Sequence, residues 1–204
     1  MLAACAAHDI GNPPFGHAGE YAIREWVTTH DTEVFGRGGV SSGVRADLEL
    51  FEGNAQGFRI ASRPDNPKTG YLRLTYATLG AMIKYPWHSE DQRAKVQSKF
   101  NVFSTEQPLF ETMMAAMGLV DEHKVCHRHP MSFLTEAADD ICYRIMDLED
   151  AVEIGILHET RVRDLYAGST GGKRGGESLA VLRGEMIRTL IDLSLIHISE
   201  PTRL

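Results

Sequence analysis

The sequence has no long apolar segment and only three cysteines. No run of roughly 18 consecutive apolar residues occurs, so a membrane-spanning helix is not expected. The short apolar start, residues 1–7, lacks the basic region of a signal peptide. Cys5, Cys126 and Cys142 are widely spaced and form no Cys-x-x-Cys pair. This pattern indicates reduced thiols in a cytoplasmic protein rather than a disulfide framework.

A surplus of positive charge is also missing. The chain carries 28 acidic and 21 basic residues, and its formal net charge is -7. This balance argues against general nucleic-acid binding, which usually requires a basic stripe. It leaves a nucleotide substrate open, because a metal ion and a few lysines or arginines can bind a polyphosphate inside an acidic protein.

Alternating apolar patterns typical of strands are lacking as well, and helical spacing takes their place. The longest helical pattern, over 130–157, has apolar residues at Phe133, Leu134, Ala137, Ile141, Ile145, Leu148 and Val152. Further helices are expected over 2–7, 17–28, 48–61, 72–83, 106–118 and 178–193. A polar surface excursion is expected over 87–105, and a glycine-rich loop over 166–177. The predicted fold class is all-α.

Both ends of the sequence look cut. Residues 193–203 resemble the in-frame translation of a sequencing adaptor, so we expect 193–204 to be non-native and 1–192 to be a partial domain. At the other end, Met1 opens directly on an apolar helix that leads to His8. Enzymes rarely begin so close to their active sites, and we therefore expect the natural chain to continue beyond both ends.

The first chemical signal is the pair His8-Asp9. Imidazole nitrogen and carboxylate oxygen suit a divalent metal such as Mn, Fe, Co or Mg, although such a pair alone is more often a surface feature of a helix end. Two prolines and a glycine then force an ordered loop over residues 12–16. His17 and Glu20 follow three positions apart near a helix start, so they project from neighbouring faces.

Four blocks of the sequence, in order, resemble the signature blocks of the deoxyguanosine triphosphate triphosphohydrolase family. They are HDIGNPPFGHAGE at 8–20, LFEGNAQGFR at 50–59, LTY through KYP at 74–86, and EAADDICY with DLEDA at 136–151. The resemblance implies an HD-domain helical phosphohydrolase core, truncated at both ends. It also implies a divalent metal (Mn, Mg or Co) and hydrolysis of dGTP to deoxynucleoside and inorganic triphosphate, with other deoxynucleoside triphosphates left open as substrates.

The resemblance also implies which residues carry the chemistry. His8 and Asp9 match the central pair of a His…His-Asp…Asp metal site, and Asp139 matches its last ligand. The family's first histidine would precede Met1, so it is not in this sequence. His17 and Glu20 match an acid/base pair near the scissile phosphate, where the carboxylate would fix the tautomer of the imidazole.

Asn54, Lys84 and Tyr85 match residues that face the triphosphate, with a helix cap as the alternative role of Asn54. Lys99 is a further candidate for the triphosphate, but its surroundings are less distinctive and a solvated surface lysine is equally expected there.

The last block places a second set of candidates on one helix. Asp139, Tyr143 and Asp147 follow at four-residue intervals, so they stack along one helix face about 12 Å long. The resemblance implies that Asp147 binds the deoxyribose 3′-hydroxyl and that Tyr143 packs on the sugar. Asp140, one position round the helix, is expected beside the site or on the surface.

Three alternatives remain open. The first is another HD-domain nucleotide phosphohydrolase, acting on a different dNTP or on a nucleoside monophosphate. The second is a non-catalytic nucleotide-sensing or oligomer-forming relative, against which the intact candidate residues argue. The third is a catalytically inert fragment of the family. A homo-oligomer in the cytoplasm is implied by the resemblance, and no membrane partner is expected.

Overall fold

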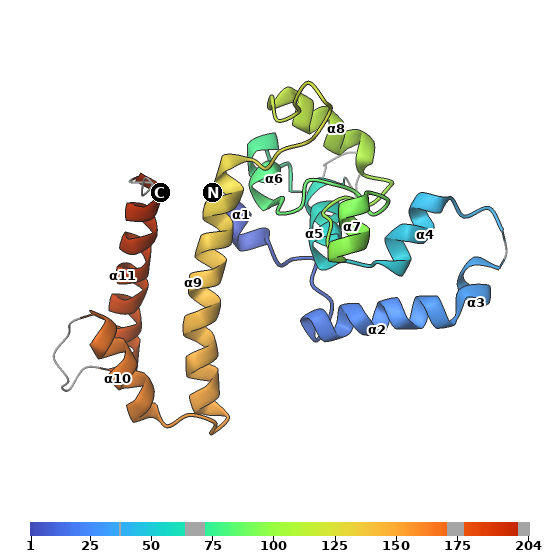
Figure 1. The fold of residues 1–204 in the computed structure, drawn as a ribbon. Helices are drawn as coiled ribbons and strands as arrows, with labels where there is room; N and C mark the ends of the chain where they lie inside the picture. Colours follow the sequence, from blue (N-terminus) through green and yellow to red (C-terminus); the bar gives the residue numbers. More distant parts are fainter. Residues whose placement is uncertain (37, 64–71, 171–177, 200–204) are drawn as a thin grey trace. The chain divides into compact units, whose positions relative to one another are not determined.

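The structure is a computed structural model that describes residues 1–36, 38–63, 72–170 and 178–199. These residues form eleven helices and no strand, with isolated β-bridges joining His88 to Val102 and Val120 to Cys126 (Figure 1). The predicted all-α class is confirmed. Within the described ranges, no helix has both the length and the apolar character needed to cross a membrane.

The helices fall into two compact units, residues 1–135 and residues from 136 onward. The first unit contains α1 (Leu2–Ala7), α2 (Gly16–Thr29), α3 (Asp31–Phe35), α4 (Ser42–Glu49), α5 (Gly53–Ser62), α6 (Tyr76–Met82), α7 (Gln92–Gln97) and α8 (Gln107–Ala116). The helix α9 (Pro130–Glu153) begins in the first unit and continues into the second, which also contains α10 (Glu159–Thr170) and α11 (Leu179–Ser199).

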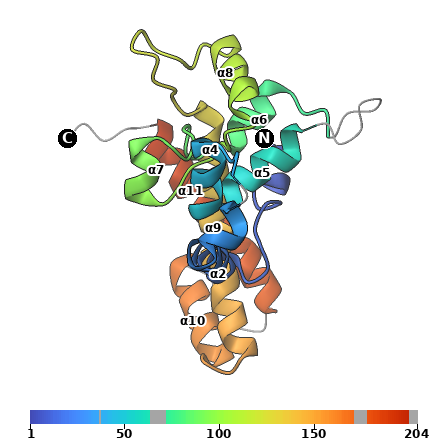
Figure 2. The same ribbon diagram turned by 90° about the vertical axis from the view of Figure 1, so that its right-hand side faces the viewer.

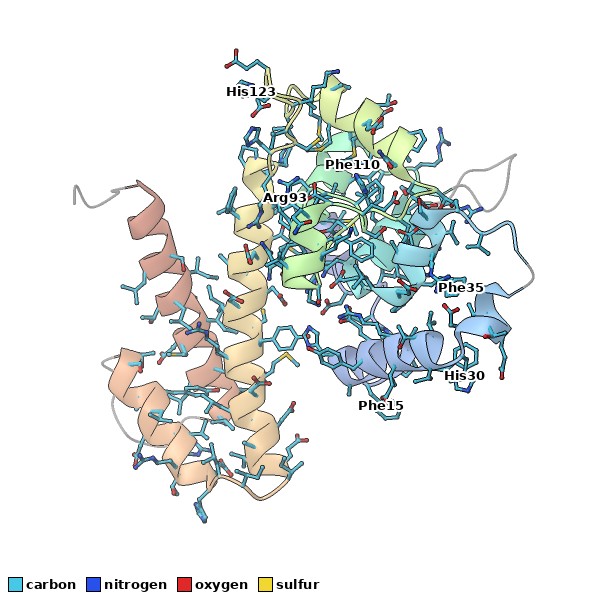
Figure 3. All side chains as sticks on the ribbon, turned by 45° about the vertical axis from the view of Figure 1, so that its right-hand side comes forward. Phe15, His30, Phe35, Arg93, Phe110 and His123 are labelled. Carbon is cyan, nitrogen blue, oxygen red and sulfur yellow. The ribbon has the colours of Figure 1, made fainter. Side chains whose placement is uncertain are left out.

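The main core of the first unit lies between α1, α5, α6 and α8. The helix α6 packs against α1, α5 and α8, as Figure 1 shows. Phe58 of α5 meets Phe110 of α8 edge to face, with ring centroids 6.3 Å apart, and Figure 3 labels Phe110 in this position. Met113, Met114 and Ile83 fill the remaining space and are almost fully buried. Burial of these large side chains stabilises the arrangement of helices that supports the site.

A second, aromatic core shows that the prediction for residues 87–105 is wrong. This stretch contains α7, and Phe100, Val102 and Phe103 within it are buried. Phe100 and Phe103 pack with Ala94 against α5, so the segment is part of the interior rather than a surface excursion. Polar residues between the buried positions conceal the pattern, because no regular period connects these aromatics.

Several predicted boundaries also change. The helix expected over 48–61 is two helices, α4 and α5, separated by residues 50–52. The helix expected over 72–83 starts only at Tyr76, where the Thr75 hydroxyl accepts a hydrogen bond from Thr78 N. The glycine-rich loop expected over 166–177 is helical as far as Thr170, and 171–177 lie outside the described residues. The other expected helices are confirmed to within a few residues, except that 154–157 follow the end of α9. The non-native origin of 193–204 stays a prediction, with 193–199 continuing α11.

The second unit has a core of its own. Ile145 of α9, Val162 and Tyr166 of α10, and Leu182 of α11 are buried together. The Tyr166 hydroxyl donates a hydrogen bond to the Ile145 carbonyl at 3.2 Å, which satisfies its polar atom inside this core. The helices α10 and α11 pack side by side, as Figure 1 shows, and Figure 2 shows the same helices together with the end of α9 after a turn of 90°.

Candidate active site

His8 and Asp9 lie just after α1 ends at Ala7. The His8 Nδ1 is 2.6 Å from the Cys5 carbonyl oxygen, so this ring nitrogen carries the proton and donates it. Nε2 is then the nitrogen able to bind a metal when the ring is neutral. It lies 3.2 Å from Asp9 Oδ2. The two expected ligand atoms are therefore neighbours, and both side chains reach solvent.

The third expected ligand belongs to the second unit. Asp139, Tyr143 and Asp147 all lie within the continuous helix α9, so their four-residue spacing places them along one face as predicted. Asp139 is half-buried, whereas Asp140 beside it in sequence is exposed. Tyr143 and Asp147 are exposed too, with the Tyr143 side chain 52% accessible.

The loop before α2 turns sharply through two left-handed residues, Phe15 at φ 66° and Gly16 at φ 53°. A bulky residue rarely adopts this conformation, and the Phe15 ring is 91% exposed at the start of the helix (Figure 3). His17 follows in the first turn of α2 and is exposed. None of the described residues forms a hydrogen bond or ion pair with His17, so the expected pairing with Glu20 is not present.

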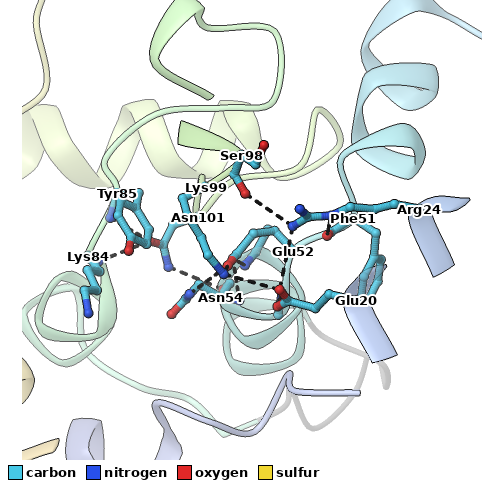
Figure 4. Close-up of polar contacts among 12 residues, drawn as sticks. Glu20, Arg24, Phe51, Glu52, Asn54, Lys84, Tyr85, Ser98, Lys99 and Asn101 are labelled. Carbon is cyan, nitrogen blue, oxygen red and sulfur yellow. Dashed lines mark hydrogen bonds and ion pairs between the residues drawn. The ribbon is translucent and has the colours of Figure 1, made fainter. Parts of the chain in front are cut away.

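Glu20 instead points toward the start of α5 (Figure 4). It is only 4% exposed, and its Oε1 accepts a hydrogen bond from Gly53 N at 2.8 Å. Its Oε2 lies 3.3 Å from Lys99 Nζ and 3.7 Å from an Arg24 guanidinium nitrogen. Arg24 also donates to the Phe51 carbonyl, so the carboxylate and the guanidinium together join α2 to the chain before α5.

Glu52, which the sequence patterns did not single out, is fully buried at the centre of this network. Its Oε2 accepts hydrogen bonds from Asn54 N at 2.7 Å and Ala55 N at 3.3 Å, and thereby caps α5. Its Oε1 accepts from Asn54 Nδ2 at 3.0 Å and from Lys99 Nζ at 2.7 Å. An acidic residue directly before the Gly-Asn start of α5 was the available signal, but glutamate is not among the preferred caps.

Lys99 is an interior cation rather than a solvated surface lysine. Its side chain is 22% exposed and its ammonium is shared between Glu52 and Glu20. Burial alone would lower the pKa of Lys99. The hydrogen bonds and negative charges of the two carboxylates outweigh that effect and hold its pKa above the ordinary value.

The Asn54 amide has a defined orientation. Because a carboxylate without a proton can only accept, Nδ2 must be the atom that faces Glu52. Its Oδ1 points away from Glu52, as Figure 4 shows. The alternative role of Asn54 as the helix cap does not apply, since Glu52 occupies the capping position.

Lys84 and Tyr85 are connected to the same network through their main chain. The side chain of Asn101, 2% exposed, accepts hydrogen bonds from Lys84 N at 3.1 Å and Tyr85 N at 2.7 Å. Its Nδ2 donates to the Asn54 carbonyl at 3.4 Å. The candidate residues at 54, 84–85 and 99 come from three separate parts of the chain. Two buried side chains, Glu52 and Asn101, hold them together (Figure 4).

Comparison with known proteins gives a consistent result. No protein-family model matches the chain. A Pseudomonas aeruginosa protein named deoxyguanosinetriphosphate triphosphohydrolase-like protein is 42% identical in an alignment that covers 93% of this chain and 46% of the relative. A Synechocystis protein with the same name is 45% identical in an alignment that covers 80% of this chain and 40% of the relative.

A Yersinia pestis protein named deoxyguanosinetriphosphate triphosphohydrolase is 30% identical in an alignment that covers 92% of this chain and 41% of the relative. The chain therefore spans a little less than half the length of these curated relatives.

Proposed function

Because the chain belongs to the deoxyguanosinetriphosphate triphosphohydrolase family over nearly its whole length, we propose that it serves hydrolysis of dGTP, or of another deoxynucleoside triphosphate. The products would be a deoxynucleoside and inorganic triphosphate. The observation that carries the proposal is the network around Glu52 and Asn101, which gathers Asn54, Lys84, Tyr85 and Lys99. Lys84, Tyr85 and Lys99 suit a triphosphate, since two ammonium groups and a phenol can serve its anionic oxygens.

The proposed metal site consists of His8, Asp9 and Asp139, with Mn, Mg or Co as the ion. The donor set fits such an ion, because imidazole nitrogen and carboxylate oxygen both bind it, and the Nδ1 contact with Cys5 leaves Nε2 as the nitrogen that can accept a metal. A bound divalent cation would polarise a phosphate oxygen and lower the pKa of a water molecule. His8 and Asp9 hold their ligand atoms close together through the Cys5 carbonyl contact and the end of α1.

Proton transfer is assigned to His17. Its exposed ring near the N-terminal end of α2 can exchange protons with a substrate or with water. Glu20 is proposed as its partner, although its carboxylate would have to leave the Gly53 amide to reach the ring. Lys84 and Lys99 would balance the charge that develops on the leaving triphosphate.

Sugar recognition is assigned to Asp147 and Tyr143 on α9. Asp147 would accept a hydrogen bond from the deoxyribose 3′-hydroxyl. A Tyr143 ring packed on the sugar would leave little room for a 2′-hydroxyl, which would favour dGTP over GTP.

By the same family resemblance, we propose that the full-length protein is a cytoplasmic homo-oligomer. Sedimentation measurements would test its assembly.

The test is a nucleotide panel with identification of the products. The chain, and a version extended to the length of its relatives, would be assayed with Mn, Mg or Co on the four dNTPs, GTP and dGMP. Phosphorus NMR should detect inorganic triphosphate from dGTP in a metal-dependent reaction. Release of pyrophosphate would contradict the proposed bond cleavage, and turnover of dGMP alone would favour a monophosphate hydrolase.

A further inference from the structure

We propose that Glu52 is a positioning residue for this reaction: one buried carboxylate fixes both the Asn54 amide and the Lys99 ammonium beside the start of α5. The inference rests on the proposed function for the identity of the substrate. The contacts by which Glu52 holds Asn54 and Lys99 do not depend on which substrate is bound. No motif or resemblance assigns a role to this residue.

The two carboxylate oxygens of Glu52 accept hydrogen bonds from different kinds of donor. Oε2 accepts the main-chain amides of Asn54 and Ala55 and satisfies the first turn of α5. Within the part of the chain that the structure describes, Oε1 accepts from two side-chain donors, Asn54 Nδ2 and Lys99 Nζ. Capping alone would need one oxygen, and the second oxygen is therefore used to place two groups that we assign to the substrate.

The hydrogen bond from Asn54 Nδ2 to Glu52 determines which groups the Asn54 side chain can bind. With its Nδ2 directed to Glu52, its carbonyl oxygen faces the opposite side (Figure 4). An amide oxygen repels a phosphate oxygen and accepts a hydrogen bond from a donor such as water. We therefore assign the Asn54 Oδ1 to a proton-bearing partner, the attacking water, rather than to the triphosphate itself.

The same contact decides how Lys99 acts. Its positive charge faces two buried carboxylates, Glu20 and Glu52, and Arg24 supplies a second positive charge near Glu20. The group is thus close to charge balance before any substrate arrives. Lys99 provides a fixed donor rather than a mobile, uncompensated charge, and its ability to attract an anion is reduced by Glu52.

This arrangement predicts opposite effects on binding and on catalysis in Glu52→Gln. The amide keeps the shape but has one accepting oxygen, so it cannot both cap α5 and hold Asn54 and Lys99. The kcat for dGTP in the extended version should fall roughly 10- to 100-fold, as for other supporting residues of active sites. Inorganic triphosphate, measured by titration calorimetry, should bind roughly 3- to 10-fold more tightly because a nearby negative charge is lost.

Asp47→Asn is the matched control. The Asp47 carboxylate is also buried and accepts from Ser89 Oγ at 2.6 Å, Ser104 N at 2.8 Å and Ser104 Oγ at 2.6 Å. Among the described residues, its hydrogen-bond partners are Ser89 and Ser104, and none of them is an ammonium group or a candidate site residue. This variant should lose thermal stability, but in its folded temperature range both kcat and the affinity for triphosphate should equal those of the wild type.

Glu52→Asp keeps the test decisive if the glutamine variant does not fold. Aspartate is a preferred N-cap and retains the charge, but its side chain is one methylene shorter and does not reach Lys99. It should lower kcat without tightening triphosphate binding. A kcat equal to that of Asp47→Asn in both Glu52 variants would overturn the positioning role.

If the wild type produced no triphosphate from dGTP, the proposed function would fail. Calorimetry with inorganic triphosphate would then still test the role of Glu52 without any turnover. An unchanged affinity for triphosphate in Glu52→Gln would refute the inference.

Discussion

The two histidines of the first sequence block, His8 and His17, differ in the contacts that hold their rings. His8 is fixed by its Nδ1 contact with the Cys5 carbonyl and lies against Asp9, which suits a ligand that must keep one nitrogen available. His17 is exposed in the first turn of α2, and no partner for it lies in the described parts of the chain. An unconstrained ring suits proton exchange better than ligation.

This difference predicts a separation of metal binding from turnover. In the extended version, His17→Ala should lower kcat for dGTP by about 10²- to 10⁴-fold, the usual cost of losing one general acid/base, while Mn affinity is kept. His8→Ala should abolish Mn binding. Titration of Mn followed by electron paramagnetic resonance, together with steady-state kinetics, measures both. Loss of the metal in His17→Ala would show that the two roles are assigned wrongly.

Whole elements approach each other closely where α5 begins. A Cβ added to Gly11 would lie 2.0 Å from Gly57 N and 2.2 Å from Gly53 O, so the turn after His8 is in contact with the backbone of α5. Main-chain atoms cannot move aside as the end of a flexible side chain can. The absence of a side chain at Gly11 therefore sets the distance between the His8-Asp9 turn and the helix that carries Asn54.

We expect Gly11→Ala to destabilise the fold by about 1–3 kcal/mol or more, the range for overpacking of an interior. Gly184→Ala is the control. It lies within α11, and apart from the adjoining backbone of its own helix no atom is within 4 Å of the added Cβ. The exchange should stabilise the helix by about 1 kcal/mol. Urea unfolding followed by circular dichroism compares the two. Equal unfolding midpoints would mean that the close approach is not required.

The same elements show how far sequence patterns reach. The helix α9 was predictable because its apolar residues repeat at the helical period over many turns. The break between α4 and α5 was not, because Glu52 favours helix by propensity and interrupts it only as a cap with buried partners. The candidate residues Asn54, Lys84 and Tyr85 were predicted from a family resemblance, and Lys99 was predicted only from its charge. Asn101 carries no local signal, because it holds main-chain groups 16 and 17 residues away. For Glu52 the only local signal was its place before the start of α5, and its contact with Lys99 is 47 residues distant in sequence.

At the level of the whole molecule, the hydrophobic interior is divided. The core around Ile145, Val162, Tyr166 and Leu182 is distinct from the cores of the first unit, and it uses α10, α11 and the later part of α9. A defect in one core should therefore be felt mainly by the helices that build it. Such local response is typical of proteins whose cooperative units differ in stability.

Leu182→Ala tests this division. Truncating a buried leucine should cost about 2–5 kcal/mol. Hydrogen exchange followed by mass spectrometry should show faster exchange in α10 and α11, while α5, α6 and α8 keep their protection. Equal acceleration in both groups of helices would show that the chain unfolds as a single cooperative unit instead.

The Asn101 contact has a consequence for how the site can be altered. Its side chain binds the main-chain amides at 84 and 85, which every residue except proline provides. The scaffold therefore does not depend on the chemical identity of the two side chains that it presents. Positions 84 and 85 can therefore be diversified together, as in a combinatorial library, to vary the side chains at the proposed triphosphate site while the frame behind them stays the same.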